Sequence, residues 1–104
     1  VIPADGLFVV ADGFADGTTQ VANADQIASF DFQNGPDSVV LSAGELIFDA
    51  VGYGVFAAGD VFAGEGNPSA DPAAGSAIAR LFANVDTNDN ASDFAAGAPT
   101  PGSA

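Results

Sequence analysis

Short apolar runs separated by turn residues dominate the chain. Residues 7–11 read Leu-Phe-Val-Val-Ala between two Asp-Gly pairs, a pattern typical of a short strand enclosed by turns. Residues 38–41 and 45–52 are two further runs, joined at Ala43-Gly44, and together they predict a β-hairpin. Residues 77–82 predict another strand. The pattern therefore indicates an all-β chain built from at least four short strands.

Alternation within these runs predicts which side chains form the core, because successive residues of a strand point to opposite faces. The expected core residues are Phe8, Val10, Val40, Phe48, Ile78 and Phe82. Residues 23–29 carry an N-cap residue with Gln26 three positions on, which predicts one or two turns of helix. Residues 54–76 are rich in Gly, Ala, Asp and Pro and predict a long loop.

The charge balance is extreme, since fourteen Asp and Glu residues accompany one cation, Arg80, and no Lys or His, for a formal net charge of −13. Such a surface repels phosphate backbones, so we expect no nucleic-acid binding. Anionic membranes are disfavoured for the same reason, and no apolar run approaches the roughly 18 residues of a membrane span. Self-repulsion works against compaction, so salt or divalent cations should favour the folded state.

Catalytic chemistry has few candidate residues in this sequence. The chain has no His, Cys or Lys to act as base or nucleophile, and its serines lack triad partners. Glu45 and Glu65 could form the carboxylate pair of a glycosidase, but they fall in a hairpin and a loop without an aromatic-rich cleft. We therefore expect that the chain is not an enzyme.

Residues 86–93 read Asp-Thr-Asn-Asp-Asn-Ala-Ser-Asp, with side-chain oxygens at every second position. Hard cations such as Ca²⁺ need several oxygen ligands in a tight loop, so this segment is a candidate calcium site. The candidate ligands are Asp86, Asn88, Asn90 and Asp93. The start resembles an EF-hand loop, but Ala91 replaces the turn glycine and Gly97 replaces the bidentate Glu. The alternative is a structural turn, in which Asp and Asn side chains bond to their own backbone.

Arg80 has two interpretations. As an internal strut it would tie its strand to the turn at residues 86–93 or to a nearby loop, through the bidentate guanidinium. As a binding residue it would hold an anionic ligand. Either way, losing the lone cation would leave nearby carboxylates unpaired.

Four motifs follow one another in the C-terminal half of the chain, and together they resemble a known family. They are Val51-Gly52-Tyr53-Gly54, Ser76-Ala77-Ile78-Ala79-Arg80-Leu81, residues 86–94, and Pro99-Thr100-Pro101-Gly102. In this order they resemble the C-terminal two-thirds of bacterial lamin-tail domains, and the segment Ile2–Val10 resembles the family's L-P-A-G-G-Y-L-V-V. The resemblance implies an immunoglobulin-like β-sandwich that lacks its N-terminal strands. It also implies two parts, an incomplete sandwich over residues 1–94 and a Pro/Gly/Ala-rich extended tail over 95–104.

The same resemblance implies a non-catalytic module that is secreted or lies on the cell surface. Missing strands would leave an unpaired sheet edge, which invites strand addition from another chain. We expect a structural subunit that forms an extracellular filament or layer by strand complementation between copies, or that pairs with a missing N-terminal part. The donor would be the arm Val1-Ile2-Pro3 or the tail 95–104. The alternative is a calcium-dependent adhesion or ligand-binding module of a larger secreted bacterial protein.

Overall fold

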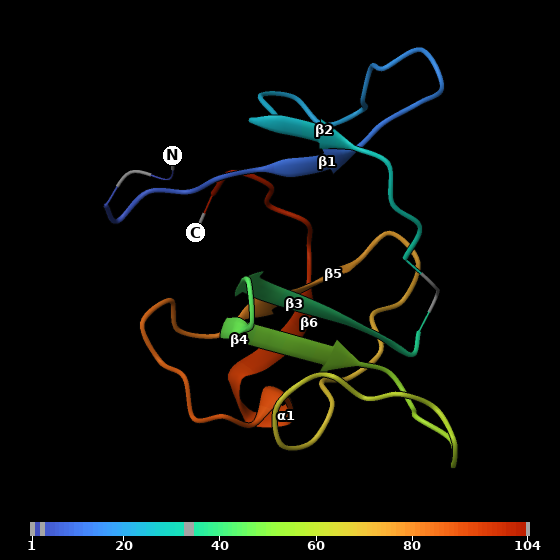
Figure 1. Cartoon of the computed structure of the whole chain (residues 1–104), viewed down its shortest axis with the longest axis vertical. Helices are drawn as coiled ribbons and strands as arrows, with labels where there is room; N and C mark the ends of the chain where they lie inside the picture. The colour runs from blue at the N-terminus through green and yellow to red at the C-terminus, as the bar shows by residue number, and fades with distance from the viewer. Residues whose placement is uncertain (1, 3, 33–34, 104) are drawn as a thin grey trace. The chain divides into compact units, whose positions relative to one another are not determined.

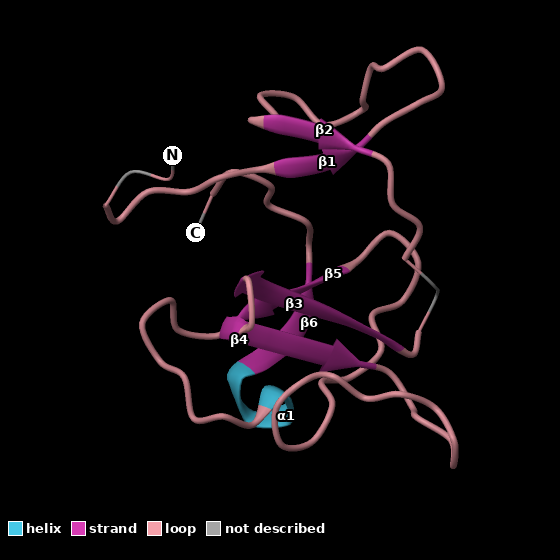
Figure 2. Ribbon diagram, in the orientation of Figure 1, coloured by secondary structure: helices cyan, strands magenta, loops and turns pink. Residues whose placement is uncertain are grey.

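The computed structural model describes residues 2, 4–32 and 35–103 of the chain (Figures 1 and 2). Residues 1–31 with 100–104 form a first compact unit, and residues 32–99 form a second. The elements are β1 (Val10–Asp12), β2 (Gln26–Ala28), β3 (Asp37–Ala43), β4 (Leu46–Tyr53), β5 (Ala77–Arg80), α1 (Asn90–Asp93) and β6 (Phe94–Gly97). The chain is β-rich, as its sequence predicts, and its strands pair into two-stranded sheets.

The sheet of the first unit is a parallel pair of β1 and β2, with Ala11 opposite Ile27. The helix predicted over residues 23–29 is wrong, because residues 26–28 form β2. Non-local bonds override the local capping signature: the Asp25 carboxylate accepts a hydrogen bond from the Val9 N–H at 2.7 Å, and Gln26 N–H donates to the Val9 carbonyl at 3.0 Å. The strand predicted over residues 7–11 starts later, at Val10, and ends at Asp12.

The hairpin predicted over residues 38–41 and 45–52 is confirmed as β3 and β4, and it is the longest paired element among the described residues. Its antiparallel register runs from Asp37 opposite Tyr53 to Ala43 opposite Leu46. The connecting turn places Gly44 at φ 59°, a left-handed conformation that glycine adopts without strain. The register shifts between Leu41 and Ser42, so β4 carries one extra residue, Phe48, in a β-bulge.

The predicted core residues are mostly exposed, which corrects the sequence interpretation. Phe48 lies at the β-bulge and is 60% exposed, and the neighbouring Leu46 and Ile47 are exposed too, because nothing among the described residues covers the turn end of the hairpin. Phe82 is 69% exposed and lies beyond the end of β5 at Arg80. Phe8, Val10 and Val40 are exposed as well, and Ile78 is half-buried. Two-stranded sheets cover little surface, and the buried apolar side chains among the described residues are those of the small Ala11 and Ala50.

In the second unit, β5 and β6 pair antiparallel from Ala77 opposite Gly97 to Arg80 opposite Phe94. The predicted boundary between sandwich and tail at residue 95 therefore falls inside β6. The loop predicted over residues 54–76 is confirmed, and one bridge, between Tyr53 and Ser69, ties it to the end of β4.

The two faces of the β3–β4 hairpin meet different neighbours. On one face, Val39, Leu41 and Val51 line a half-open cavity of about 250 Å³ together with Arg80 and Phe94 from β5 and β6. On the other face, the Phe62 ring lies so close to Gly52 that a Cβ there would overlap it. The hairpin thus has a layer against it on each face, while its outer strand β3 has no strand neighbour besides β4 among the described residues.

Candidate functional site

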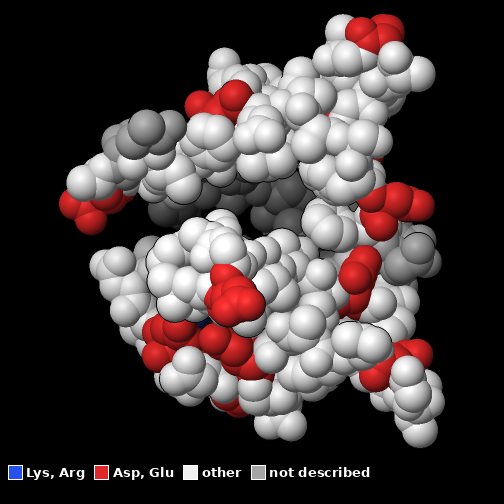
Figure 3. Space-filling view, viewed as in Figure 1, with Lys and Arg blue, Asp and Glu red and all other residues white. Residues whose placement is uncertain are grey.

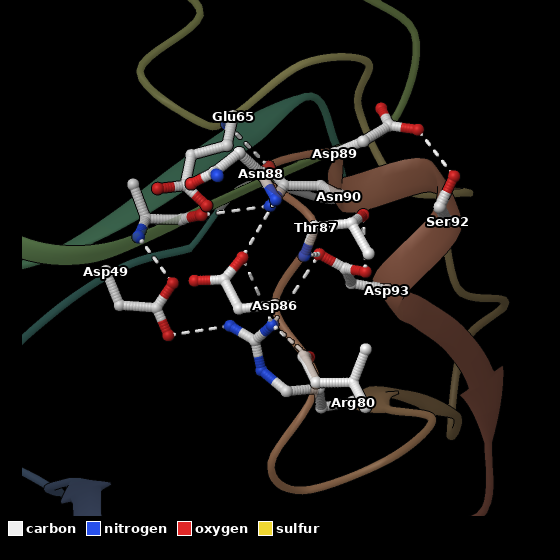
Figure 4. Close-up of polar contacts among 12 residues, drawn as sticks. Asp49, Glu65, Arg80, Asp86, Thr87, Asn88, Asp89, Asn90, Ser92 and Asp93 are labelled. Atoms are coloured by element: carbon white, nitrogen blue, oxygen red, sulfur yellow. Dashed lines mark hydrogen bonds and ion pairs between the residues drawn. The ribbon is translucent and has the colours of Figure 1, made fainter.

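Arg80 lies among four carboxylates contributed by separate parts of the second unit (Figure 4). Its Nη2 forms an ion pair with Asp49 Oδ2 on β4 at 2.7 Å, and its Nη1 donates to the Val85 carbonyl at 3.1 Å. Nη1 also lies 3.8 Å from Asp86 Oδ1 and 3.7 Å from Asp93 Oδ2. Arg80 therefore joins β5 to β4, to the turn after β5 and to α1, which confirms the interpretation of this residue as an internal strut.

Asn90, the first residue of α1, is fully buried and bonds to β4 and the following loop. Its Oδ1 accepts hydrogen bonds from Gly52 N–H at 2.8 Å and Glu65 N–H at 2.9 Å, and its Nδ2 donates to the Ala50 carbonyl at 2.9 Å. All the bonding capacity of the carbonyl oxygen is used by backbone amides, so Asn90 is a structural residue here and has no free lone pair for a cation.

Asp93, at the end of α1, is also buried and closes the turn that precedes the helix. Its carboxylate accepts hydrogen bonds from the Thr87 N–H and the Thr87 hydroxyl, both at 2.8 Å. The backbone N–H of Thr87 is the main reason that the pKa of Asp93 lies below its ordinary value, and the Thr87 hydroxyl and Arg80 act in the same direction.

Asn88 and Asp86 lie on the exposed part of this turn. Asn88 has φ 57° and its N–H donates to Asp86 Oδ1 at 2.9 Å, which is an Asx turn. The four predicted calcium ligands thus have different roles: Asn90 and Asp93 are buried and occupied, Asn88 forms the bend, and Asp86 points its carboxylate toward Arg80. These hydrogen bonds are those of a structural turn, and calcium binding by this segment stays a prediction.

A different acidic group contains Asp86. Asp49 from β4, Glu65 from the loop after β4, and Asp86 each place a carboxylate oxygen within 4.8 Å of the others. We call these three residues the acidic cluster. Carboxylate oxygens are the ligands that Ca²⁺ prefers, so these three side chains could hold a metal ion. Sequence spacing gave no sign of Asp49, because its position beside Asp86 depends on the packing of β4 against the turn after β5.

Glu65 is the member of the acidic cluster that has a buried oxygen, Oε2, without a hydrogen-bond partner among the described residues. Burial raises the pKa of Glu65, the charges of Asp86 and Asp49 raise it further, and Arg80 opposes them. The folded chain therefore holds the Glu65 proton more tightly than the unfolded chain does.

Glu65→Gln is expected to raise the melting temperature at pH 7 and to change it little at pH 4. Because the folded-state pKa is raised, stability falls as the pH rises from the ordinary glutamate pKa to the raised one, and the penalty persists at neutral pH. A neutral amide removes this penalty and can donate to the neighbouring carboxylates. Thermal melting at both pH values measures the effect, with the exposed Glu45→Gln as control. Equal gains for both variants would mean that only net charge matters.

Comparison with known proteins gives no family assignment: no protein-family model, curated protein or solved structure matches the chain. Within the part of the chain that the structure describes, no helix has the length and apolar character needed to cross a membrane. The lamin-tail resemblance rests on the sequence motifs and stays a prediction.

Proposed function

We propose that this chain is a non-catalytic structural module of an extracellular or cell-surface assembly, in which copies associate through open β-sheet edges. In this proposal β3–β4 and β5–β6 are the facing sheets of an incomplete immunoglobulin-like sandwich of lamin-tail type. The observation that carries it is the outer edge of β3, a seven-residue strand in a two-stranded sheet. Unpaired strand edges of this kind invite pairing with another chain.

The hydrogen bonds of β4 show which backbone N–H and C=O groups of β3 lie on that edge. The Ala50 carbonyl bonds to Asn90, and Gly52 bonds to Asn90 through its N–H and to Ser69 through its carbonyl, so both residues turn away from β3. In an antiparallel pair, residues opposite such positions also turn their amides outward. Val40 is opposite Ala50, so the Val40 N–H and C=O lie on the outer edge. Among the described residues none hydrogen-bonds to them.

The hairpin also presents apolar side chains to solvent. Its exposed apolar residues are Val39, Val40, Leu41, Leu46, Ile47 and Phe48. Figure 3 shows the Asp and Glu side chains in several separate groups on one face, with uncharged surface between them. An exposed apolar patch beside an open edge is typical of an interaction surface. Between Asp37 and Glu45 the sequence has no charge, so two copies could meet here despite a net charge of −13 on each.

Extension beyond a pair needs a second surface, and the first unit offers one. Its β1–β2 sheet is likewise two-stranded, so in each unit there is a sheet to which no third strand is paired among the described residues. A chain with two such surfaces can contact two neighbours at once, which is the requirement for a filament or layer. The terminal arm considered as a donor in the sequence includes Val1 and Pro3, which lie outside the described residues.

The acidic cluster supports a second candidate function, a calcium-dependent adhesion or ligand-binding module. Bound Ca²⁺ would neutralise carboxylates that Arg80 alone balances only in part, and would hold β4, the loop after it and the turn after β5 together. A cation that binds the folded chain alone raises its stability with increasing concentration.

Sedimentation velocity over a range of protein concentrations, in EDTA and in Ca²⁺, separates the two functions. Assembly through sheet edges predicts that the sedimenting mass rises with concentration in EDTA, and that it persists in high salt because backbone pairing and apolar contacts carry it. Electron microscopy of the concentrated sample should then show ordered particles or fibres. A chain that stays monomeric throughout, with a melting temperature raised by Ca²⁺ and not by Mg²⁺, would contradict assembly and support the adhesion module.

A further inference from the structure

We infer that β3 pairs antiparallel with β3 of a second copy, with Val40 opposite Val40 of that copy. This inference rests on the proposed assembly and names its partner strand and register. The result is a twofold-symmetric, four-stranded sheet in the order β4, β3, β3, β4, in which the same surface is used on both sides.

Hydrogen-bond positions along β3 support this register. The bulge residue Phe48 lies in β4, so β3 alternates without interruption and the amides of Ser38, Val40 and Ser42 all point outward. With Val40 opposite Val40 of the second copy, Ser42 falls opposite Ser38 of that copy. At these positions the outward backbone groups of one copy face those of the other, so that N–H groups can meet C=O groups. The Ser38 N–H is held by Asp37 Oδ1 at 2.8 Å, while its carbonyl is left to accept from Ser42 of the second copy.

Charge placement favours β3 as the surface at which two like-charged chains meet. Residues 38–44 carry no ionisable side chain, and the carboxylates nearest in sequence are Asp37 and Glu45. In the inferred register Asp37 lies opposite Ala43 of the second copy, and Glu45 lies beyond the paired region. No carboxylate is therefore placed directly opposite another, an arrangement that would destabilise the pair.

Other edges are weaker candidates for this contact. β1 and β2 have three residues each, and β1 ends on the charged Asp12. β6 has four residues, Phe94–Gly97, three of them small, and is followed by Pro99 and Pro101, which cannot donate to a ladder. β3 has seven residues and three exposed β-branched or aliphatic side chains in its centre.

Side chains on both faces of β3 gain partners in the pair. On the face that lines the half-open cavity, Val39 lies opposite Leu41 of the second copy, so the apolar stripe of one hairpin continues into the other. On the opposite face the two Val40 side chains meet, and β-branched cross-strand pairs are favourable. A contact limited to one seven-residue strand edge is expected to bury less than the roughly 1,000 Å² of a stable interface. The pairing should therefore be reversible and concentration-dependent.

The test places opposite charges at position 40. Val40→Asp and Val40→Lys are each expected to weaken self-association on the order of tenfold, because the substituted residue lies opposite an identical charge. An equimolar mixture of the two variants is expected to recover association, because the opposed charges then attract. Val55→Asp and Val55→Lys are the matched controls, since Val55 is 86% exposed in the loop after β4. They should associate like the unsubstituted chain, alone and mixed.

Each outcome of sedimentation on these variants decides the inference. Variants at Val40 that associate like the Val55 controls, or a mixture as weak as either Val40 variant alone, would overturn pairing through β3 and leave assembly through another edge in place. A monomeric unsubstituted chain at every concentration would overturn both the inference and the proposed function. If the Val40 variants lose their β-rich circular dichroism, concentration-dependent hydrogen exchange at Val40 and Ser42 of the unsubstituted chain decides instead.

Discussion

Replacing Asn90 by Ala is expected to destabilise the second unit by about 3 kcal/mol or more, since each buried backbone group left without a partner costs about 1–3 kcal/mol. The Asn90 side chain bonds to Gly52 N–H, Glu65 N–H and the Ala50 carbonyl, and it has no exposed surface. Alanine would leave these groups unpaired beside a small cavity. Small domains have about 5–15 kcal/mol of total stability, so this single change removes a large part of it.

Urea unfolding followed by far-ultraviolet circular dichroism measures this loss. Asn88→Gly is the matched control: Asn88 is the same residue type two positions earlier, it is exposed, and glycine accepts its φ of 57°. The control should unfold at nearly the same urea concentration as the unsubstituted chain. Equal destabilisation by both variants would contradict the role given to Asn90.

Replacing Arg80 by Gln is expected to destabilise the second unit by about 2 kcal/mol at low ionic strength, between the values typical of exposed and of buried ion pairs. The side chain of Arg80 is 16% exposed and that of Asp49 is 41% exposed, so solvent screens the pair in part. The variant would leave Asp49, Asp86 and Asp93 close together without their cation. It would also lose the contact of the guanidinium with the Phe94 ring, whose centroid lies 4.6 Å away.

Salt and a second substitution distinguish this electrostatic effect from lost packing. The destabilisation by Arg80→Gln should shrink in high salt, because screening weakens repulsion among the remaining carboxylates. Combined with Asp49→Asn, it should cost less than the sum of the two single changes, since the two residues share one ion pair. A loss that is independent of salt and strictly additive would contradict a role for Arg80 through its ion pair with Asp49.

The β3–β4 hairpin could be predicted because the residues that specify it lie close together in the sequence. Two apolar runs flank Ala43-Gly44, and the left-handed conformation of Gly44 suits the tight turn between them. β2 was not predictable, since its pairing with β1 depends on Asp25 and Gln26 meeting Val9, sixteen or more positions away in sequence. Phe48 shows a third limit: alternation assigns it to the core, but nothing among the described residues covers the turn end of the hairpin, where Phe48 is 60% exposed.

The candidate site divides in the same way. Arg80 could be singled out because it is the only cation beside fourteen carboxylates, which left a strut and an anion-binding residue as its two interpretations. Its main partner, Asp49, could not be identified from the sequence, because the contact depends on how β4 lies against β5. Asn88 and Asn90 are indistinguishable by residue type and spacing, yet one forms an exposed bend and the other is wholly buried. Asn90 is buried because α1 directs its side chain toward β4, and the spacing of residues in the sequence does not reveal that direction.

The claim that β3 is the pairing edge is tested most directly by amide hydrogen exchange at Val40 and Ser42 in the unsubstituted chain, measured as protein concentration rises. In an isolated chain these amides point outward and should exchange quickly, whereas Val39 and Leu41, opposite Val51 and Asp49, should be protected at all concentrations. Pairing through β3 predicts that protection of Val40 and Ser42 increases in step with the sedimenting mass. Rapid exchange at both amides in the fully associated protein would contradict it.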